Sequence, residues 1–323
     1  MQAVMQRAYG SADVLHLEHV DRPTMGNDEV LLRVHAAGID RGTWHLMSGQ
    51  PYAIRLAAGL RRPKTPVPGQ DVAGTVVAVG TTATGFTVGD DVFGIARGSF
   101  AEYAAARADK LALKPARLSF EQAAAVPVSG LTALQALRSG QARAGQRVLV
   151  IGASGGVGTF AVQIAHALGA EVTGVASTAK ADLVRSIGAD HVIDYTRDDF
   201  AAGPQRYDVI LDIGGNAPLS RLHRALTRSG TLVIVGGEDG GRWTGIRRQA
   251  GALARSPFVR QRLTTFIAKQ TRADIAHLAE LVEAGDLTPV IDRTYPLVEA
   301  PGAMRRLVAG QARGKLVITM ATG

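Results

Sequence analysis

Residues 147–158, Arg-Val-Leu-Val-Ile-Gly-Ala-Ser-Gly-Gly-Val-Gly, decide the fold of this chain. The apolar run Val148–Ile151 is short and ends at a glycine, which predicts a buried strand of a parallel sheet. After the glycines, apolar residues recur at helical spacing until Gly169, which ends the pattern as a helix C-cap would. Strand, glycine turn and helix in this order form the context in which a glycine motif predicts a dinucleotide site.

The glycine turn fits the pattern G-x-G-x-x-G incompletely. Gly155 and Gly158 stand at its second and third glycine positions, but Ala153 stands at the first, directly after Gly152. A tight strand-to-helix turn without a ligand would use the same residues. In a dinucleotide site, the glycines let the backbone approach a pyrophosphate, and the helix N-terminus supplies unpaired N–H groups and a positive dipole end.

The next predicted strand favours a phosphorylated dinucleotide. Glu171–Ala176 reads as this strand, and Ser177-Thr178-Ala179-Lys180 follows it. A site for NAD would place a carboxylate here, about 20 residues after the motif, to bind the ribose 2′-hydroxyl. None lies between Val172 and Lys180. Two hydroxyls and an ammonium suit a 2′-phosphate instead. The sequence therefore predicts NADPH, the alternative being a helix N-cap beside a solvated lysine.

Composition excludes several classes of protein. The chain has 323 residues, enough for two domains, and 46% hydrophobic against 20% charged residues indicates a globular protein with a large core. It contains no cysteine, which excludes disulfides, thiolate zinc sites and cysteine nucleophiles. With no signal sequence and no long apolar run, we expect a cytoplasmic protein without a transmembrane segment.

The net charge of +8 is concentrated between Arg242 and Arg272, where eight Lys or Arg occur without any Asp or Glu. Such a segment can bind nucleic acid or an acidic membrane surface. No zinc-finger, RNA-binding or aromatic pattern accompanies it, so we expect no nucleic-acid partner. A solvated arm around a cofactor or a dimer contact is the preferred interpretation.

The chain divides into a β-rich part and an alternating part. Residues 1–117 contain short strand patterns separated by turns, and the segment Ile39–Pro68, with weak periodicity, is expected to be a loop with substrate contacts. Residues 118–287 alternate strand and helix, which predicts an α/β doubly wound parallel sheet. Thr271–Ala284 is expected to be an amphipathic helix stopped by Gly285, and Leu316–Met320 a strand that returns to the first domain.

Five motifs together resemble the medium-chain dehydrogenase/reductase superfamily, and within it the zinc-free quinone oxidoreductase branch. The motifs are Pro68–Gly74 (PGQDVAG), Val88–Val92 (VGDDV), Gly130–Ala133 (GLTA), Gly152–Gly158 and Gly314–Val317 (GKLV). The resemblance implies a GroES-like β-rich catalytic domain, 1–117 completed by 288–323, and a Rossmann NADP(H)-binding domain, 118–287. It also implies a cofactor and substrate between the two domains, and a homodimer.

Departures from the zinc alcohol dehydrogenases of this superfamily are informative. Those enzymes have cysteine where Asp40 stands and His-Glu where Gln70-Asp71 stands, and a further cysteine near Val128. Asp40, His45 and Asp71 offer oxygen and nitrogen donors, but no His pair occurs at ligand spacing. The sequence therefore predicts no metal site.

Without a metal there is no Lewis acid to polarise an alcohol or a simple ketone. Quinones and α,β-unsaturated carbonyls accept hydride readily, because the resulting charge is delocalised onto an oxygen. The protein then has mainly to orient the acceptor against the nicotinamide and stabilise that oxygen. We therefore expect an NADPH-dependent, zinc-independent reductase of a quinone or an activated enone.

The resemblance also implies roles for individual residues. Tyr52 matches a tyrosine of the quinone pocket, Asp40 occupies the vacated metal-ligand position, and Thr132 is expected beneath the nicotinamide. Trp44 and His45 are expected as pocket walls. The expected cofactor contacts are Ser154, Gly155, Gly156 and Val157 at the pyrophosphate, Ser177, Lys180 and Tyr195 at the 2′-phosphate, and Val235, Gly236 and Lys315 on the other side.

Two alternatives stay open. One is an enoyl-thioester reductase of the same superfamily, in which the basic segment would meet a carrier or coenzyme A phosphate. The other is an NADPH-binding regulatory protein with vestigial redox activity, which would use the basic segment to bind membrane or RNA.

Overall fold

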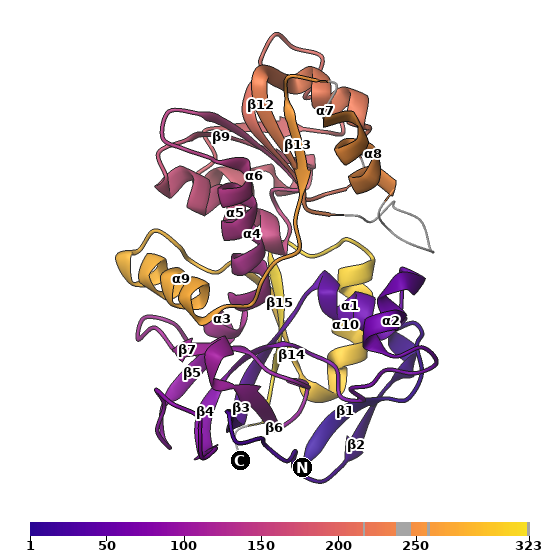
Figure 1. The fold of residues 1–323 in the computed structure, drawn as a ribbon, viewed down its shortest axis with the longest axis vertical. Coiled ribbons are helices and arrows are strands. Elements are labelled where there is room, and N and C mark those ends of the chain that lie inside the picture. The colour runs from indigo at the N-terminus through magenta and orange to yellow at the C-terminus, as the bar shows by residue number, and fades with distance from the viewer. Residues whose placement is uncertain (216, 237–246, 257–258, 322–323) are drawn as a thin grey trace. The chain divides into compact units, whose positions relative to one another are not determined.

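The computed structural model describes residues 1–215, 217–236, 247–256 and 259–321, which form two compact units (Figure 1). The first unit contains Met1–Leu131, Lys269–Gly285 and Pro289–Gly323, and the second contains Thr132–Ala268 and Asp286–Thr288. None of the helices in the described part of the chain is long and apolar enough to cross a membrane.

The first unit is built on a seven-stranded sheet with the order β14-β15-β3-β4-β5-β7, in which β6 also pairs with β3. A separate antiparallel pair, β1 and β2, completes its strands. The bounds are β1 (Gln2–Gln6), β2 (Leu15–His19), β3 (Glu29–Ile39), β4 (Asp71–Val79), β5 (Asp91–Ile95), β6 (Tyr103–Arg107), β7 (Leu111–Leu113), β14 (Ile291–Pro296) and β15 (Lys315–Thr319).

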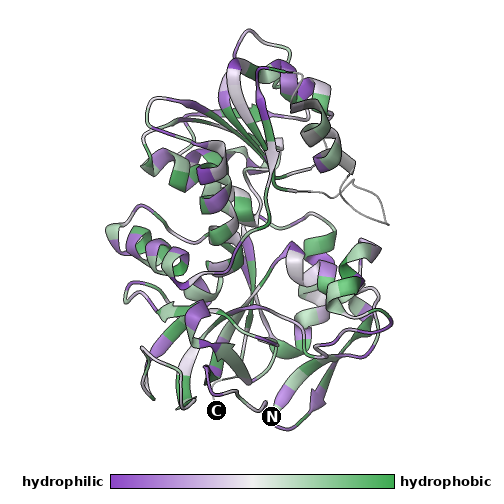
Figure 2. Ribbon diagram, viewed as in Figure 1, coloured by the Kyte–Doolittle hydropathy of each residue, from purple (hydrophilic) through white to green (hydrophobic). Residues whose placement is uncertain are grey.

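Short helices surround this sheet. They are η1 (Ala12–Val14), α1 (Arg41–Ser48), η2 (Tyr52–Ile54), α2 (Arg55–Ala58), η3 (Ala108–Lys110), α3 (Phe120–Ala124), α9 (Arg272–Ala284), η6 (Leu297–Glu299) and α10 (Ala300–Val308), and α4 (Pro127–Gly140) begins here. The core lies between β3, β15 and α10, where Leu32, Ile318 and Met304 are fully buried. Helix α9 turns Ile275, Leu278 and Val282 inward, and Figure 2 shows both hydrophobic and hydrophilic colours along it.

The C-terminal strand returns to the N-terminal sheet, as the sequence predicted. Leu316 of β15 pairs with Ile39 of β3 in an antiparallel register. Strand β14 pairs with β15 in parallel. The last strand of the chain is therefore an interior strand of the first sheet.

The loop expected between Ile39 and Pro68 contains α1, η2 and α2, so that expectation was wrong for Arg41–Ser48 and for Tyr52–Ala58. Asp40 caps α1 by accepting a hydrogen bond from the Thr43 backbone N–H (2.8 Å), and Gly49 ends the helix in the left-handed conformation. Eight residues are too few to show a clear hydrophobic periodicity, so in the sequence only the two cap residues indicate this helix.

The second unit is a six-stranded parallel sheet with the order β10-β9-β8-β11-β12-β13. Its strands are β8 (Arg147–Ile151), β9 (Glu171–Ala176), β10 (His191–Asp194), β11 (Tyr207–Asp212), β12 (Leu226–Ile234) and β13 (Arg262–Thr265), and its helices are α5 (Gly156–Ala167), η4 (Thr178–Lys180), α6 (Ala181–Ser186), α7 (Leu219–Ala225) and α8 (Arg247–Arg255). Numbered within the unit, the order is 3-2-1-4-5-6, that of the Rossmann fold.

The two units divide the chain at other points than 117 and 288. Helix α3 packs on β3 and β4, and α9 packs on β7, so both helices belong to the first unit. Strand–helix alternation in the sequence could not show this, because it does not say which sheet a helix covers.

Candidate functional site

The glycine turn of the second unit joins β8 to α5. Gly155 is the N-cap of α5 in an extended conformation, and a Cβ added to it would meet only the carbonyl oxygen of Gly152, at 3.4 Å. A Cβ on Gly158 would collide with that same oxygen. The turn thus leaves open space at Gly155 and packs tightly at Gly158. In a dinucleotide motif the second glycine lets the backbone approach the pyrophosphate, and the third allows close packing of the helix on the strand.

Two further strand ends lie beside this turn. The backbone N–H groups of Ile213 and Gly214 donate to the Ile151 carbonyl at 3.1 and 3.0 Å. Those of Val235 and Gly236 both donate to the Asp212 carbonyl at 3.1 Å. The carboxyl ends of β8, β11 and β12 therefore form one glycine-rich edge. It lies where β8 and β11 adjoin and the strand order reverses, the usual ligand position in open α/β sheets.

This edge brings together several of the expected cofactor contacts. Ser154, Gly155, Gly156 and Val157 form the turn and first residues of α5, while Val235 and Gly236 follow β12. The glycine positions that a Cβ would fill, and the helix N-terminus beside them, fit a dinucleotide pyrophosphate.

A second group of expected contacts lies where β9 and β10 end. Ser177 follows β9, and its carbonyl accepts from the Lys180 N–H at 2.9 Å. Tyr195 follows β10, and its N–H donates to the Ala176 carbonyl at 3.1 Å. Tyr195 as a residue is 62% exposed. The structure therefore brings Ser177, Lys180 and Tyr195 to the same corner of the sheet.

One carboxylate at this corner was missed by the sequence reasoning. Asp194 ends β10, and it accepts hydrogen bonds from the hydroxyls of Thr178 and Thr196. The hydrogen bond from Thr178 is the main reason why the pKa of Asp194 lies below its ordinary value. Asp194 pairs with Ala176 across the strands. Only the register of β10 against β9 places Asp194 at this corner, and the sequence does not show that register.

The expected catalytic residues fall on different elements, Asp40 and Tyr52 in the first unit and Thr132 in the second. Asp40 and Tyr52 stand beyond opposite ends of α1, Asp40 as its buried N-cap and Tyr52 in η2 after the C-cap. The Arg55 guanidinium lies 4.7 Å from the centroid of the Tyr52 ring. Thr132 lies in α4, among the first residues of the second unit.

Lys315, an expected cofactor contact, is buried in the first unit with an exposed fraction of 1%. Its Nζ donates to Asp71 Oδ2 at 2.9 Å and to Ser129 Oγ at 3.1 Å. The Val128 N–H donates to the other carboxylate oxygen at 2.7 Å. Burial raises the pKa of Asp71 to about 6, with Lys315 acting in the opposite direction and Asp40 in the same one.

These contacts do not fit a catalytic zinc site. Asp71 is committed to Lys315 and Val128, and Asp40 to the cap of α1. Among the described residues, no three His, Cys, Asp or Glu side chains gather in a way that could hold a metal ion. A catalytic zinc needs three such protein ligands.

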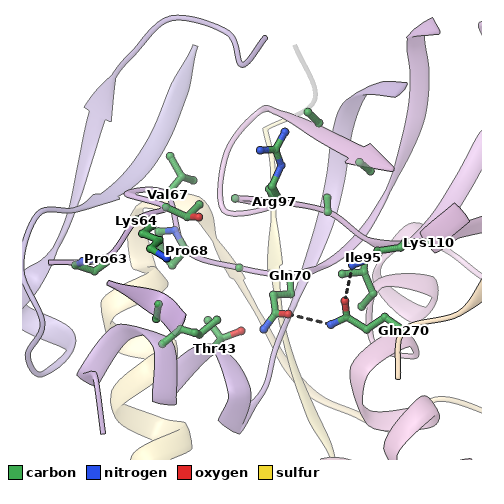
Figure 3. Close-up of a pocket in the computed structure, with 18 of the residues that line it drawn as sticks. Thr43, Pro63, Lys64, Val67, Pro68, Gln70, Ile95, Arg97, Lys110 and Gln270 are labelled. Carbon is green, nitrogen blue, oxygen red and sulfur yellow. Dashed lines mark hydrogen bonds between the residues drawn. The ribbon is translucent and has the colours of Figure 1, made fainter. Parts of the chain in front are cut away.

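The first unit also contains a cavity of about 350 Å³ (Figure 3). Thr43, Leu46, Gln70, Ile95 and Gln270 are among its lining residues. Charged residues also line it, namely Lys64, Arg97, Arg107, Lys110 and Glu29, of which Arg97 and Glu29 form an ion pair at 2.8 Å. The Gln270 amide nitrogen donates to Gln70 Oε1 at 3.1 Å, and Lys110 Nζ donates to Gln270 Oε1 at 3.2 Å.

Sequence reasoning missed these glutamines as a pair. Gln70 was noted only for replacing a histidine, and Gln270 lies 200 positions further on, directly before the N-cap Thr271. No local sequence pattern indicates that these two glutamines lie close together. The segment Arg242–Arg272, which was expected to form a basic arm, lies partly outside the described residues, at 242–246 and 257–258.

Comparisons with known proteins agree with this architecture. A family model described as an alcohol dehydrogenase GroES-like domain matches residues 26–116, and one described as a zinc-binding dehydrogenase matches residues 187–318. The second description mentions zinc, but among the described residues no three side chains gather that could hold a metal ion.

Relatives match along nearly the whole chain. A 2-methylene-furan-3-one reductase from Solanum lycopersicum is 33% identical over 98% of this chain and 79% of its own length. A chloroplast envelope quinone oxidoreductase homolog from Arabidopsis thaliana is 30% identical over 98% of both chains. The structure of Escherichia coli quinone oxidoreductase complexed with NADPH superposes with a TM-score of 0.85, at 26% identity, over 99% of this chain and 100% of that one. The chain therefore belongs to the medium-chain dehydrogenase/reductase superfamily, in its quinone oxidoreductase branch.

Proposed function

We propose that this protein is an NADPH-dependent, zinc-independent oxidoreductase that reduces a quinone or an α,β-unsaturated carbonyl. The observation that carries the proposal is the glycine-rich edge of the parallel sheet, with open space at Gly155 and a corner of hydroxyl and ammonium groups beside it. NAD(P)H oxidoreductases among the relatives, including an NADPH-dependent alkenal/one oxidoreductase 32% identical to this chain, support it.

Residues of the second unit would hold the cofactor. Ser154, Gly156 and Val157 would donate backbone N–H groups to the pyrophosphate, and Val235 and Gly236 lie at the same edge. The Gly155 N–H already donates to the Gly152 carbonyl at 3.1 Å, so Gly155 would contribute the open space through which the pyrophosphate approaches. The cofactor, when bound, supplies the hydride. These residues bind and orient the cofactor without taking part in bond making.

We propose that Ser177 and Lys180 select the 2′-phosphate. Lys180 supplies a point charge, Ser177 a hydroxyl, and Tyr195 an exposed ring at the same corner. Asp194 lies close by, but its carboxylate is engaged by Thr178 and Thr196. Its negative charge would oppose a bound phosphate.

The proposed class of acceptor follows from the side chains of the first unit that could act as metal ligands. Because Asp40 and Asp71 are committed to protein groups, the site offers no Lewis acid to a simple alcohol or ketone. A quinone or enone needs only orientation and stabilisation of its oxygen. We propose Tyr52 as a hydrogen-bond donor or wall of the acceptor pocket, Thr132 as a support for the nicotinamide, and Asp40 as a structural cap.

The test is NADPH consumption by the purified chain in the presence of chelator, with ortho- and para-quinones and simple enones as acceptors and NADH in parallel. NADPH-selective turnover supports the proposal. Activity that appears only on addition of zinc would contradict it. Turnover of an enoyl thioester alone would move the assignment to a thioester reductase, and NADPH binding without any turnover to a regulatory role.

Three further expectations stay predictions. They are a homodimer, a cytoplasmic location and the absence of a nucleic-acid partner. Several relatives carry a chloroplastic or mitochondrial location in their names, and fluorescence microscopy of the tagged protein tests its location.

A further inference from the structure

Three side chains of the first unit form a directional chain of hydrogen bonds, Lys110 to Gln270 to Gln70 (Figure 3). An ammonium group has three donors and no acceptor, so Lys110 can bind only the oxygen of the Gln270 amide. The nitrogen of Gln270 must then face Gln70, and Gln70 must present its oxygen to it. The amide nitrogen of Gln70 is thereby turned away from Gln270.

The backbone holds each member of this chain in place. Lys110 ends η3, and Gln270 directly precedes Thr271, the N-cap of α9, which packs on η3 and β7. Gln70 directly precedes β4, and its carbonyl accepts from the Ala96 N–H at 2.8 Å. The orientation of the Gln70 amide is therefore set by rigid elements, as a preorganised donor requires.

The donor end of Gln70 lies beside α1. A Cβ added to Gly42 of that helix would lie 3.7 Å from Gln70 Nε2. Because residue 42 is glycine, this position carries no side chain. Gln70 and Thr43 both line the cavity of about 350 Å³, a volume within the range of small-molecule sites.

We propose that Gln70 donates a hydrogen bond from Nε2 to the carbonyl oxygen of the hydride acceptor, and that Lys110 and Gln270 are positioning residues that keep this donor outward. The proposal rests on the proposed function, because it names the group that recognises the acceptor. Gln70 occupies the position of a histidine in the zinc enzymes, so a neutral donor stands where those enzymes have a metal ligand.

The chemistry needs a donor at this oxygen. The hydride would come from NADPH, which would be oxidised to NADP+. When hydride adds with its electron pair to the β-carbon of an enone, a C–H bond forms and the C=C π pair shifts toward the carbonyl. The C=O π pair then moves onto oxygen, and solvent supplies a proton to the product. A donor fixed in advance stabilises the oxygen as its charge grows, at no cost in reorganisation.

The experiment compares kcat/KM for 1,4-naphthoquinone and for a simple enone among four variants. Gln70→Leu removes the donor, Gln70→Glu replaces it with an acceptor of similar shape, Lys110→Met breaks the chain, and Lys110→Arg keeps a cation. We expect losses of about 10–100-fold for both Gln70 variants, at or below the loss of about 10²–10³-fold for one oxyanion-hole donor. Lys110→Met should lose severalfold and Lys110→Arg should recover most of it.

Three controls separate this role from a structural one. The exposed Gln311→Leu should behave as wild type, the affinity for NADPH should stay within about twofold in all variants, and the melting temperatures should match. Loss confined to kcat/KM for carbonyl acceptors, with rescue by Lys110→Arg, supports the proposal. Gln70→Leu with wild-type kcat/KM overturns it.

Failure of the proposed function has a different signature. If the wild-type protein reduces none of the acceptors, calorimetric titration with 1,4-naphthoquinone still decides the role of Gln70. Wild-type binding that Gln70→Leu weakens supports a donor to a carbonyl ligand. Equal binding by both proteins, or no binding by either, overturns it.

Discussion

Lys315 Nζ lies 2.9 Å from Asp71 Oδ2, and the two side chains are only 1% and 0% exposed. The pair joins β15 to β4 across 244 positions of sequence and is completed by Ser129 and the Val128 N–H. A buried pair of this kind stabilises little beyond what an apolar pair of similar volume would, but the loss of one partner leaves an uncompensated charge in the core.

Lys315→Met should therefore lower the free energy of unfolding by about 3–5 kcal/mol at pH 7, because it leaves the Asp71 carboxylate buried without its cation. Asp71→Asn combined with Lys315→Met removes both charges and should recover most of that loss. Urea denaturation followed by circular dichroism measures both. A double variant no more stable than Lys315→Met would show that packing, and not charge, explains the loss.

The pH dependence of stability follows from the raised pKa of Asp71. Because burial holds this pKa at about 6 in the folded state, above its ordinary value of 3.8, the folded protein binds a proton that the unfolded chain has released. The contribution of Asp71 is thus fully present below about pH 4 and is lost as pH rises to about 6. A shift of about two pKa units corresponds to about 3 kcal/mol.

The double variant Asp71→Asn/Lys315→Met serves as the reference in that measurement. Carboxylates away from the substituted pair, such as Asp194 and Asp199, have pKa values that hydrogen bonds lower. They titrate alike in both proteins and cancel in the difference. From pH 4 to 6, the wild type should lose stability relative to the double variant. Parallel unfolding curves across this range would mean that Asp71 is ionised in the folded state throughout.

Two glycines of the same turn should respond differently to alanine. Gly155→Ala places a methyl group in open space, so we expect a change in stability within about 1 kcal/mol but a loss of NADPH affinity of tenfold or more, because the pyrophosphate must approach there. Gly158→Ala forces a methyl group onto the Gly152 carbonyl and should destabilise the fold by about 1–3 kcal/mol.

Urea denaturation without cofactor and fluorescence titration with NADPH separate these effects. The two measurements should rank the variants in opposite order, with Gly158→Ala worse for folding and Gly155→Ala worse for binding per folded molecule. Unchanged NADPH affinity in Gly155→Ala would remove this turn from the cofactor site.

Much of the fold could be predicted from the chain, because its strongest signals are local. The apolar run before Gly152 and the hydrophobic period after it specify β8 and α5 directly. Ser119 and Gln122 form the reciprocal capping box at α3 that their spacing indicates. Helix α1 was not predicted, because only its two cap residues, Asp40 and Gly49, indicate it and no hydrophobic periodicity does.

The site was less predictable, because its parts meet only through the tertiary structure. The resemblance of the motif around Lys315 implied a cofactor contact, yet Lys315 is buried and bound to the carboxylate of Asp71, 244 positions away. Asp194 reaches Thr178 through the pairing of β10 with β9. Gln70 and Gln270 approach each other only because α9 packs on the first sheet.

The corner formed by β9 and β10 gives the last prediction, which concerns the choice between NADPH and NADH. Lys180→Ala should weaken NADPH binding by about tenfold or more and leave NADH binding within about twofold, because only NADPH carries the 2′-phosphate that the ammonium would neutralise. Asp194→Asn removes a negative charge from the same corner, so it should strengthen NADPH binding by severalfold with little effect on NADH.

The two variants act on one charge balance, so their effects on the NADPH-to-NADH affinity ratio should have opposite signs. They should also shrink at high salt, because the groups at this corner are partly exposed and screening weakens such interactions. Arg138→Ala serves as a control for the loss of a cation, because Arg138 lies in the last turn of α4 and not in the segments that form this corner. If Lys180→Ala weakens both dinucleotides equally, then Lys180 supports the shape of η4 and the 2′-phosphate is recognised elsewhere.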